Sequence, residues 1–325
     1  MPMVFSKDVF ALDPEAETER ICCFIRKQVF QDYKRKGAVV GLSGGVDSAL
    51  IASLCARALG VDRVLGLLLP EKESNPVSEP YAREQAAKLG IRTERVDLMP
   101  LLTAMGVYDR KNEVIRHLCP GFDPDRDKTK ISLPPNLLER QGLNVFTLTV
   151  TKPDGSSRAF RLGAEDFRAI EAAQNMKQRT RMMQLYYHAE KLHYIVCGTT
   201  NKTENDQGFF VKFGDGGVDI EPIAHLYKAQ VYQLARHLGV TENILNRTPS
   251  PDTWSGRVSD EEFYFRMPYH VLDQLLYAWN NDVPNSEIRD ALGLTDEQIA
   301  RAFGDFDAKH KATAHLRTGP ASIAS

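Results

Sequence analysis

The sequence predicts an α/β protein, in which a doubly wound, mostly parallel sheet carries helices on both faces, with a small β-hairpin insertion and helices near the C-terminus. The main observation is that short apolar segments alternate with longer segments of helical periodicity. Such alternation implies parallel strands joined by crossover helices. In addition, a chain of 325 residues is long enough to bury a substantial core.

The predicted elements follow one another from the N-terminus. Residues 14–33 have helical periodicity, with an acidic first turn and a basic end that suit the helix dipole. A strand is predicted at 37–42 and, after a turn at 43–47, a helix that Gly60 ends. The remaining predicted elements are strands at 63–70, 92–98 and 193–200 and helices at 80–90, 171–192 and 224–239.

The alternation breaks down between residues 105 and 167, where we expect a long insertion. Its last part alternates in polarity at 144–150 and 156–162 around Lys-Pro-Asp-Gly, which predicts a β-hairpin. Two short helical patterns, near 269–278 and 286–292, lie close to the C-terminus. We therefore expect a main domain over 1–260, which includes the insertion at 105–167, and a C-terminal helical segment and tail over 261–325.

Composition excludes several classes of function. The formal charge of −2 and the isoelectric point near 6.5 give no overall field to attract nucleic acid or an anionic membrane surface. Five cysteines, an odd number without a C-x-x-C pair, fit reduced thiols better than a disulfide framework. No apolar run reaches the ~18 residues that a membrane span needs. We expect a soluble cytoplasmic protein that binds neither nucleic acid nor membrane.

The most informative stretch is VVGLSGGVDS, Val39–Ser48, where a strand turns into a helix. It satisfies G-x-S-x-G, but a nucleophile elbow follows several strands, and here only about forty residues precede it. A Walker P-loop is excluded because Val46 and Asp47 leave no lysine. The third interpretation is a phosphate cradle, in which glycines let backbone N–H groups approach an anion and two serines add hydroxyl donors.

Asp47 narrows the choice of ligand for this turn. Its charge would repel a bare phosphate unless a magnesium ion lay between them, so the carboxylate predicts a metal-bound nucleotide. One alternative stays open, namely that Gly44 and Gly45 only make a tight connection and that Asp47 favours the helix dipole.

The segment SGGVDS, Ser43–Ser48, resembles the signature of the PP-loop, or N-type ATP pyrophosphatase, group. Within that group, Val196–Val240 resembles NAD synthetase in GTTNKTE, in GFFVKFGDGG and in the following Pro, Leu, Lys and Gln. NMKQRTRM at 175–182 and the Pro249-Ser250 pair extend the resemblance over most of residues 15–250. It implies an adenine nucleotide alpha hydrolase-like fold. It also implies ATP-dependent amidation of nicotinic acid adenine dinucleotide to NAD+ by ammonia, through an acyl-adenylate, with release of AMP and pyrophosphate.

The resemblance also implies site residues. ATP would bind to Gly41, Leu42, Ser43, Gly44, Gly45, Val46, Asp47, Ser48, Thr199, Lys228 and Ser250. Asp47 and Glu204 would hold Mg2+, and Asp47 and Lys228 would carry catalysis. The dinucleotide acid would bind to Asn175, Arg179, Tyr186, Lys212, Asp219, His310 and Lys311, the last two in the C-terminal segment that closes on the site.

The family resemblance further implies a homodimer. Because the chain has no room for a glutaminase domain, we expect free ammonia, or ammonia from a separate partner, as nitrogen source. Two positions depart from the family pattern, Leu68 where a basic residue is usual and Glu171 where many relatives have an aromatic ring. Two other functions therefore stay open. One is a paralogous PP-loop amide ligase acting on a different carboxylic acid, and the other is a non-catalytic nucleotide-binding protein.

Overall fold

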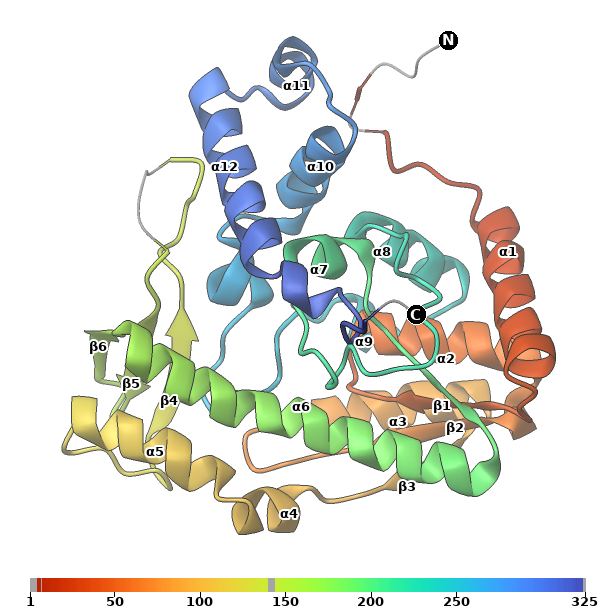
Figure 1. Ribbon diagram of the computed structural model, residues 1–325, viewed down its shortest axis with the longest axis horizontal. Helices are drawn as coiled ribbons and strands as arrows, with labels where there is room; N and C mark the ends of the chain where they lie inside the picture. The colour runs from red at the N-terminus through yellow and green to blue at the C-terminus, as the bar shows by residue number, and fades with distance from the viewer. Residues whose placement is uncertain (1–4, 7, 140–143, 324–325) are drawn as a thin grey trace.

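The protein is built on a four-stranded parallel sheet, which lies at the lower right in Figure 1. The computed structural model describes residues 5–6, 8–139 and 144–323. The sheet has the order β3-β2-β1-β7 and consists of β1 (Ala38–Gly41), β2 (Val64–Leu68), β3 (Arg92–Arg95) and β7 (Ile195–Cys197). All neighbouring strands are parallel. The predicted sheet is confirmed, although its strands are shorter than the predicted ranges.

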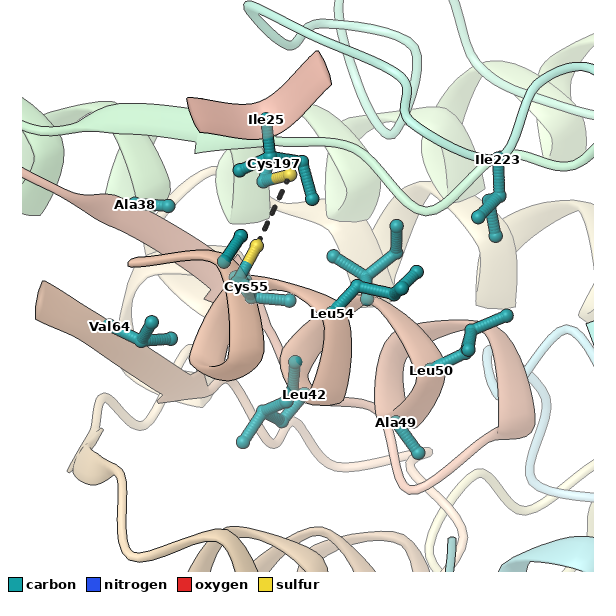
Figure 2. Packing of buried hydrophobic residues seen from close by; sticks show 14 of the residues in the cluster. Ile25, Ala38, Leu42, Ala49, Leu50, Leu54, Cys55, Val64, Cys197 and Ile223 are labelled. Carbon is teal, nitrogen blue, oxygen red and sulfur yellow. Dashed lines mark hydrogen bonds between the residues drawn. The ribbon is translucent and has the colours of Figure 1, made fainter. Parts of the chain in front are cut away.

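Helices cover both faces of the sheet. One face carries α1 (Pro14–Lys27), α2 (Val46–Leu59), α3 (Ser78–Leu89) and α8 (Lys228–His237), and the other carries α6 (Ala164–Leu192). Successive side chains of strand β1 point to opposite faces of the sheet, so each face has its own hydrophobic core. Ala38 and Val40 belong to the first core, under α1, α2, α3 and α8, whereas Val39 belongs to the second core, under α6. Figure 2 shows the first core, where the sulfurs of Cys55 and Cys197 lie 3.6 Å apart as free thiols.

The helix boundaries follow local capping signals. α1 begins as predicted, because Asp13 Oδ1 accepts hydrogen bonds from two N–H groups of its first turn. A π-helical turn at Gln28–Asp32 extends it. The predicted starts of two other helices are wrong. α6 begins at 164 rather than 171, after Gly163 and with an acidic first turn. α8 begins at 228 rather than 224, because the Gln230 side chain accepts the N–H of Tyr227.

The insertion contains more structure than the sequence predicted. β5 (Thr147–Thr151) and β6 (Ser157–Arg161) form the expected hairpin, and β4 (Lys128–Ser132) pairs with β5 as a third strand. Helices α4 (Met99–Ala104) and α5 (Val107–Leu118) precede this sheet. The prediction missed α5 because two residues of its buried face, Lys111 and Asn112, are polar and interrupt the apolar pattern.

The C-terminal segment is a packed helical layer rather than a tail. α10 (Tyr269–Asn280) and α11 (Asn285–Leu292) lie where predicted, whereas α12 (Asp296–Ala312) was not predicted. Its start carries a capping box of Thr295 and Gln298, and Phe306 is buried in a core shared with α10.

The shorter helices of the chain are α7 (Lys202–Gln207) and α9 (Glu242–Leu245), with single turns at Val61–Arg63, Glu261–Phe265 and Ala314–Leu316. The boundary at residue 260 stays a prediction.

Among the residues that the structure describes, no helix combines the length and the apolar character that a membrane crossing requires.

Candidate functional site

A cavity of about 740 Å³ lies at the carboxyl ends of the parallel strands. Its wall includes Gly41 of β1, Leu68 of β2 and Cys197 of β7. This edge is where an open parallel sheet places its ligands. Phe146 of the insertion and Lys309 of α12 also line the cavity. The insertion and the C-terminal helices therefore border the same space as the sheet.

The glycine turn between β1 and α2 belongs to this wall. Gly44 has a φ of +71°, and a Cβ there would lie 2.4 Å from the carbonyl oxygen of Ser78, so only glycine fits. Gly45 caps α2 without a side-chain hydrogen bond, which leaves the first-turn N–H groups without a capping side chain. Ser43 Oγ accepts the N–H of Gly45 at 3.2 Å and lies 3.1 Å from Ser48 Oγ. This geometry suits a phosphate.

Most residues of the predicted ATP set surround the same cavity. Its wall includes Gly41, Leu42, Ser43, Gly45, Val46, Asp47, Thr199, Lys228 and Ser250. Gly44 and Ser48 are the two exceptions. Gly44 packs against the carbonyl of Ser78, and the buried Ser48 donates to the carbonyl of Gly45 at 3.0 Å. Gly44 and Ser48 therefore stabilise the conformation of the turn and do not line the cavity.

Lys228 joins the two predicted metal ligands. Its ammonium, in the first turn of α8, lies 2.6 Å from Asp47 Oδ2 and 3.2 Å from Glu204 Oε1. Asn201 Nδ2 donates to the other oxygen of Asp47 at 2.9 Å, and Asn201 and Glu204 form the capping box of α7. The buried Lys228 is thus fixed from three elements, α2, α7 and α8.

Burial and the attraction of opposite charges together shift the pKa values of Lys228 and its carboxylate partners. Burial alone would lower the pKa of Lys228, but the attraction of Asp47 and Glu204 raises it above its ordinary value, so the ammonium stays charged. Burial raises the pKa of Glu204 well above that of an exposed glutamate. It also raises the pKa of Asp260, another carboxyl on the cavity wall, to about 6.

The donor set fits a cation that arrives together with a phosphate. The described residues contain no group of three or more His, Cys, Asp or Glu side chains arranged to hold a metal. Asp47 and Glu204 offer two carboxylates beside the phosphate cradle. Mg2+ is commonly bound by one or two carboxylates plus substrate phosphates, so this pair suits a metal–nucleotide complex better than a resident ion.

The residues predicted for the dinucleotide acid separate into two groups. Asn175 lines the cavity, whereas Arg179, Tyr186, Lys212 and Asp219 do not. Tyr186 Oη donates to Asp219 Oδ1 at 3.1 Å, and Arg179 Nε donates to the carbonyl of Lys212 at 3.3 Å. Lys212 Nζ in turn donates to two carbonyls of the segment after α12, at 2.7 and 2.8 Å. These four residues therefore form two separate contacts outside the cavity wall, Arg179 with Lys212 and Tyr186 with Asp219.

His310 and Lys311 also lie outside the cavity wall. His310 Nδ1 lies 3.3 Å from the carbonyl oxygen of Asp206, and Lys311 is exposed. Their neighbours on α12, Lys309 and Ala312, line the cavity. α12 therefore reaches the site, while the predicted roles of the pair stay predictions.

Sequence reasoning missed two arginines and an asparagine at the site. Arg247 donates to the carbonyls of Ser43 and Gly44 at 3.2 and 3.1 Å and so braces the glycine turn. Arg181, two residues after Arg179 in the same Arg-Thr-Arg segment, lines the cavity. Asn201 orients Asp47. A signal existed for Arg181 in the spacing of that segment, but the contacts of Arg247 and Asn201 span more than 150 residues.

Both positions that depart from the family pattern face the same space. Leu68 and Glu171 line the cavity, Leu68 at the end of β2 and Glu171 in the first half of α6. Burial raises the pKa of Glu171. The departures therefore alter the wall of the site and not a remote surface.

Known proteins share the fold and much of the sequence. The chain matches the NAD synthase family over residues 17–119 and 118–317. It is 47% identical to the NH(3)-dependent NAD(+) synthetase of Mesorhizobium japonicum over 312 residues, 96% of this chain and 97% of that protein.

Two solved structures are similar in fold. One is NMN synthetase from Francisella tularensis, with a TM-score of 0.66, 23% identity and coverage of 96% of this chain and 99% of that chain. The other is NH3-dependent NAD synthetase from Campylobacter jejuni, with a TM-score of 0.62, 24% identity and coverage of 97% and 100%. At such identities the likeness concerns the fold alone.

Proposed function

This chain belongs to the NAD synthase family, and we propose that it catalyses the ATP-dependent amidation of nicotinic acid adenine dinucleotide to NAD+ with ammonia. The observation that carries the proposal is the contact of Lys228 with Asp47 and Glu204, at 2.6 and 3.2 Å, beside the glycine turn. A phosphate cradle next to two carboxylates and one cation suits a nucleoside triphosphate that arrives with a divalent metal.

The reaction consists of two displacements. In the first, a carboxylate oxygen of the acid forms a bond to the α-phosphorus of ATP, and the bond from that phosphorus to the bridging oxygen breaks, which releases pyrophosphate. In the second, ammonia forms a bond to the acyl carbon, the bond from this carbon to the AMP oxygen breaks, and the nitrogen loses a proton. No side-chain nucleophile is needed, so the chain contributes positioning and charge neutralisation.

The side chains of the cavity have distinct parts in this scheme. The first-turn N–H groups of α2 and the hydroxyl of Ser43 would hold phosphate oxygens. Lys228, which stays charged, would neutralise the charge that develops on the departing pyrophosphate. Thr199 and Ser250, which both line the cavity, would add hydroxyl donors to ATP.

Asp47 and Glu204 would hold Mg2+ together with the phosphates, and the ion would supply further charge neutralisation and orientation of the triphosphate. Lys228 contacts the same two carboxylates. When Glu204 is ionised, the two carboxylates outweigh the single charge of this lysine, which favours a second cation.

The dinucleotide acid would lie across the face that carries Arg179 and Asp219, with a second copy of the chain covering it. Tyr33 Oη donates to the carbonyl of Asp219 at 2.9 Å and so borders this face. Met183 and Tyr187 of α6 expose 51% and 57% of their surface. Large apolar side chains exposed on the helix that carries Arg179 support a homodimer. Arg179 and Lys212 would supply the cations for the pyrophosphate and carboxylate of the acid, and the His310-Lys311 pair would close over the dinucleotide.

The nitrogen source would be free ammonia or ammonia delivered by a separate partner. The five cysteines carry free thiols, which supports a reducing compartment such as the cytoplasm.

A product assay tests the proposed function. Protein incubated with ATP, Mg2+, ammonium and the dinucleotide acid should yield NAD+, AMP and pyrophosphate in equal amounts. Glutamine in place of ammonium should yield no NAD+. Pyrophosphate release with only a different carboxylic acid would instead identify a paralogous ligase. ATP binding with no pyrophosphate from any acid would identify a non-catalytic protein.

A further inference from the structure

A buried ionic cluster connects the insertion to the wall of the cavity. Its members are Glu71 and Glu73 in the segment after β2, Lys111 on α5 and Lys177 on α6. Each exposes 9% of its surface or less. The function proposed above gives these four residues no part.

Lys177 is the centre of this cluster. Its Nζ donates to Glu71 Oε1 at 3.0 Å, to Glu73 Oε2 at 2.5 Å and to the carbonyl of Thr253 at 2.9 Å. Lys111 donates to the second oxygen of Glu73. All donors of the Lys177 ammonium therefore have acceptors, and both oxygens of Glu73 have a lysine.

Each carboxylate oxygen of the cluster has a donor. Tyr108 Oη donates to Glu71 Oε2 at 2.8 Å, so the second oxygen of that carboxylate also has a donor. Burial alone would raise the pKa of Glu73, but attraction to Lys111 and Lys177 lowers it, so the carboxylate is charged at neutral pH. Two acids balance two lysines. Removal of a single member would leave a buried charge without its partner.

The segment that this cluster fixes, residues 70–78, reaches the phosphate cradle. The cavity wall includes Pro70, Glu71, Ser74, Asn75, Pro76 and Ser78 from this segment. The N–H of Asn75 and the hydroxyl of Ser78 donate to Asp252 at 2.8 and 2.9 Å. Arg247 donates to Ser78 Oγ at 2.9 Å and to the carbonyl of Gly44 at 3.1 Å. A continuous chain of contacts therefore links the cluster to the glycine turn.

We propose that Lys111 and Lys177 are positioning residues for the nucleotide site, and that the insertion fixes the 70–78 segment against the cradle through them. The inference rests on the proposed function, because it assumes that ATP binds in this cavity. A segment that is already ordered does not lose conformational freedom when ATP binds. Loss of the contact between the insertion and the 70–78 segment should therefore raise the KM for ATP more than it lowers kcat.

The test compares two lysines of the same insertion. Lys111→Met removes the link to Glu73, whereas Lys152→Met removes an ion pair with Asp127, 2.7 Å long, within the insertion and away from the cavity wall. We expect Lys111→Met to raise the KM for ATP about tenfold, with kcat within about twofold of the parent. Lys152→Met should leave both constants unchanged.

A double variant separates positioning from stability. Lys111→Met leaves a buried negative charge, so its thermal midpoint should fall. Adding Glu73→Gln removes that charge and should restore the midpoint, while the KM for ATP stays raised because the link is still missing. The inference would be overturned if the double variant regained both the thermal midpoint and the KM for ATP of the parent. An unchanged KM for ATP in Lys111→Met would overturn it as well. A parent protein that makes no pyrophosphate from ATP would instead contradict the proposed function, and with it this inference.

Discussion

Lys228 of α8 donates to Oδ2 of Asp47 in the first turn of α2 at 2.6 Å, although 181 residues separate the two. The same ammonium contacts Glu204 at 3.2 Å. When both carboxylates are ionised, they outweigh the charge of the one lysine that they share, next to a phosphate cradle. A triphosphate alone would be repelled here, whereas a triphosphate with a bound cation would be attracted. This relationship carries the assignment of a metal–nucleotide site.

Asp47→Asn should abolish adenylation while the fold stays intact. The amide keeps the size of the side chain but removes a charge that the cation needs, so pyrophosphate release should fall at least about 100-fold. Asp62→Asn is a matched control, because Asp62 is exposed in the Val61–Arg63 turn that follows α2. Pyrophosphate release and thermal midpoints of both variants provide the check. Near-parental activity in Asp47→Asn would remove the metal assignment.

Lys228→Met should destabilise the protein in a way that Mg2+ reverses. Without the ammonium, Asp47 and Glu204 repel each other in a buried site, which costs about 3–5 kcal/mol when one partner of a buried pair is removed. Mg2+ can neutralise both carboxylates. Its addition should therefore raise the thermal midpoint of the variant more than that of the parent. Potassium chloride at equal ionic strength is the control, and an equal effect of both salts would count against the pair as a cation site.

The affinity for Mg2+-ATP should rise with pH above neutrality. Burial raises the pKa of Glu204, so a fraction of this carboxyl is protonated in the free protein where an exposed glutamate would be ionised. The cation needs the ionised form, so affinity falls as the pH falls through the raised pKa and is full above it. Calorimetry without ammonium, from about pH 6 to pH 9, measures this dependence. The Glu204→Gln variant should bind Mg2+-ATP weakly, and its affinity should not depend on pH. An affinity of the parent protein that does not change with pH would refute the assignment of Glu204 as a cation ligand.

Gly44→Ala should cost more than Gly60→Ala. Both glycines have positive φ, +71° and +87°, so alanine strains the backbone at both. Only at Gly44 would the new Cβ meet an atom, the Ser78 oxygen at 2.4 Å, while Gly60 has open space. Gly44→Ala should therefore lose about 1–3 kcal/mol more stability and raise the KM for ATP. Equal denaturation midpoints and equal KM values in the two variants would show that the close approach is unimportant.

The cradle could be predicted from sequence because it is contiguous. Glycines, serines and Asp47 follow one strand and begin one helix, so local rules suffice. The environment of Asp47 could not be predicted, since Asn201 and Lys228 reach it only through tertiary structure. For the same reason Arg247 was missed, because its contacts with the turn depend on how the segment after α9 folds back.

The fold shows the same division between local and distant signals. The hairpin at β5 and β6 has alternating polarity and a Lys-Pro-Asp-Gly turn, and it was predicted. α5 hides its periodicity, because the ionic cluster places Lys111 on its buried face. The start of α12 has a local signal in the sequence, the capping box of Thr295 and Gln298, so this helix could have been predicted from local rules.

The central claim is that an oxygen of the acid attacks the α-phosphorus of ATP in this cavity, and isotope transfer tests it most directly. The dinucleotide acid with both carboxylate oxygens labelled with 18O should be converted in the presence of ATP, Mg2+ and ammonium. The products should be AMP with one labelled oxygen, unlabelled pyrophosphate and NAD+ with one labelled amide oxygen. Unlabelled AMP, or ADP and labelled phosphate in place of AMP and pyrophosphate, would contradict the account.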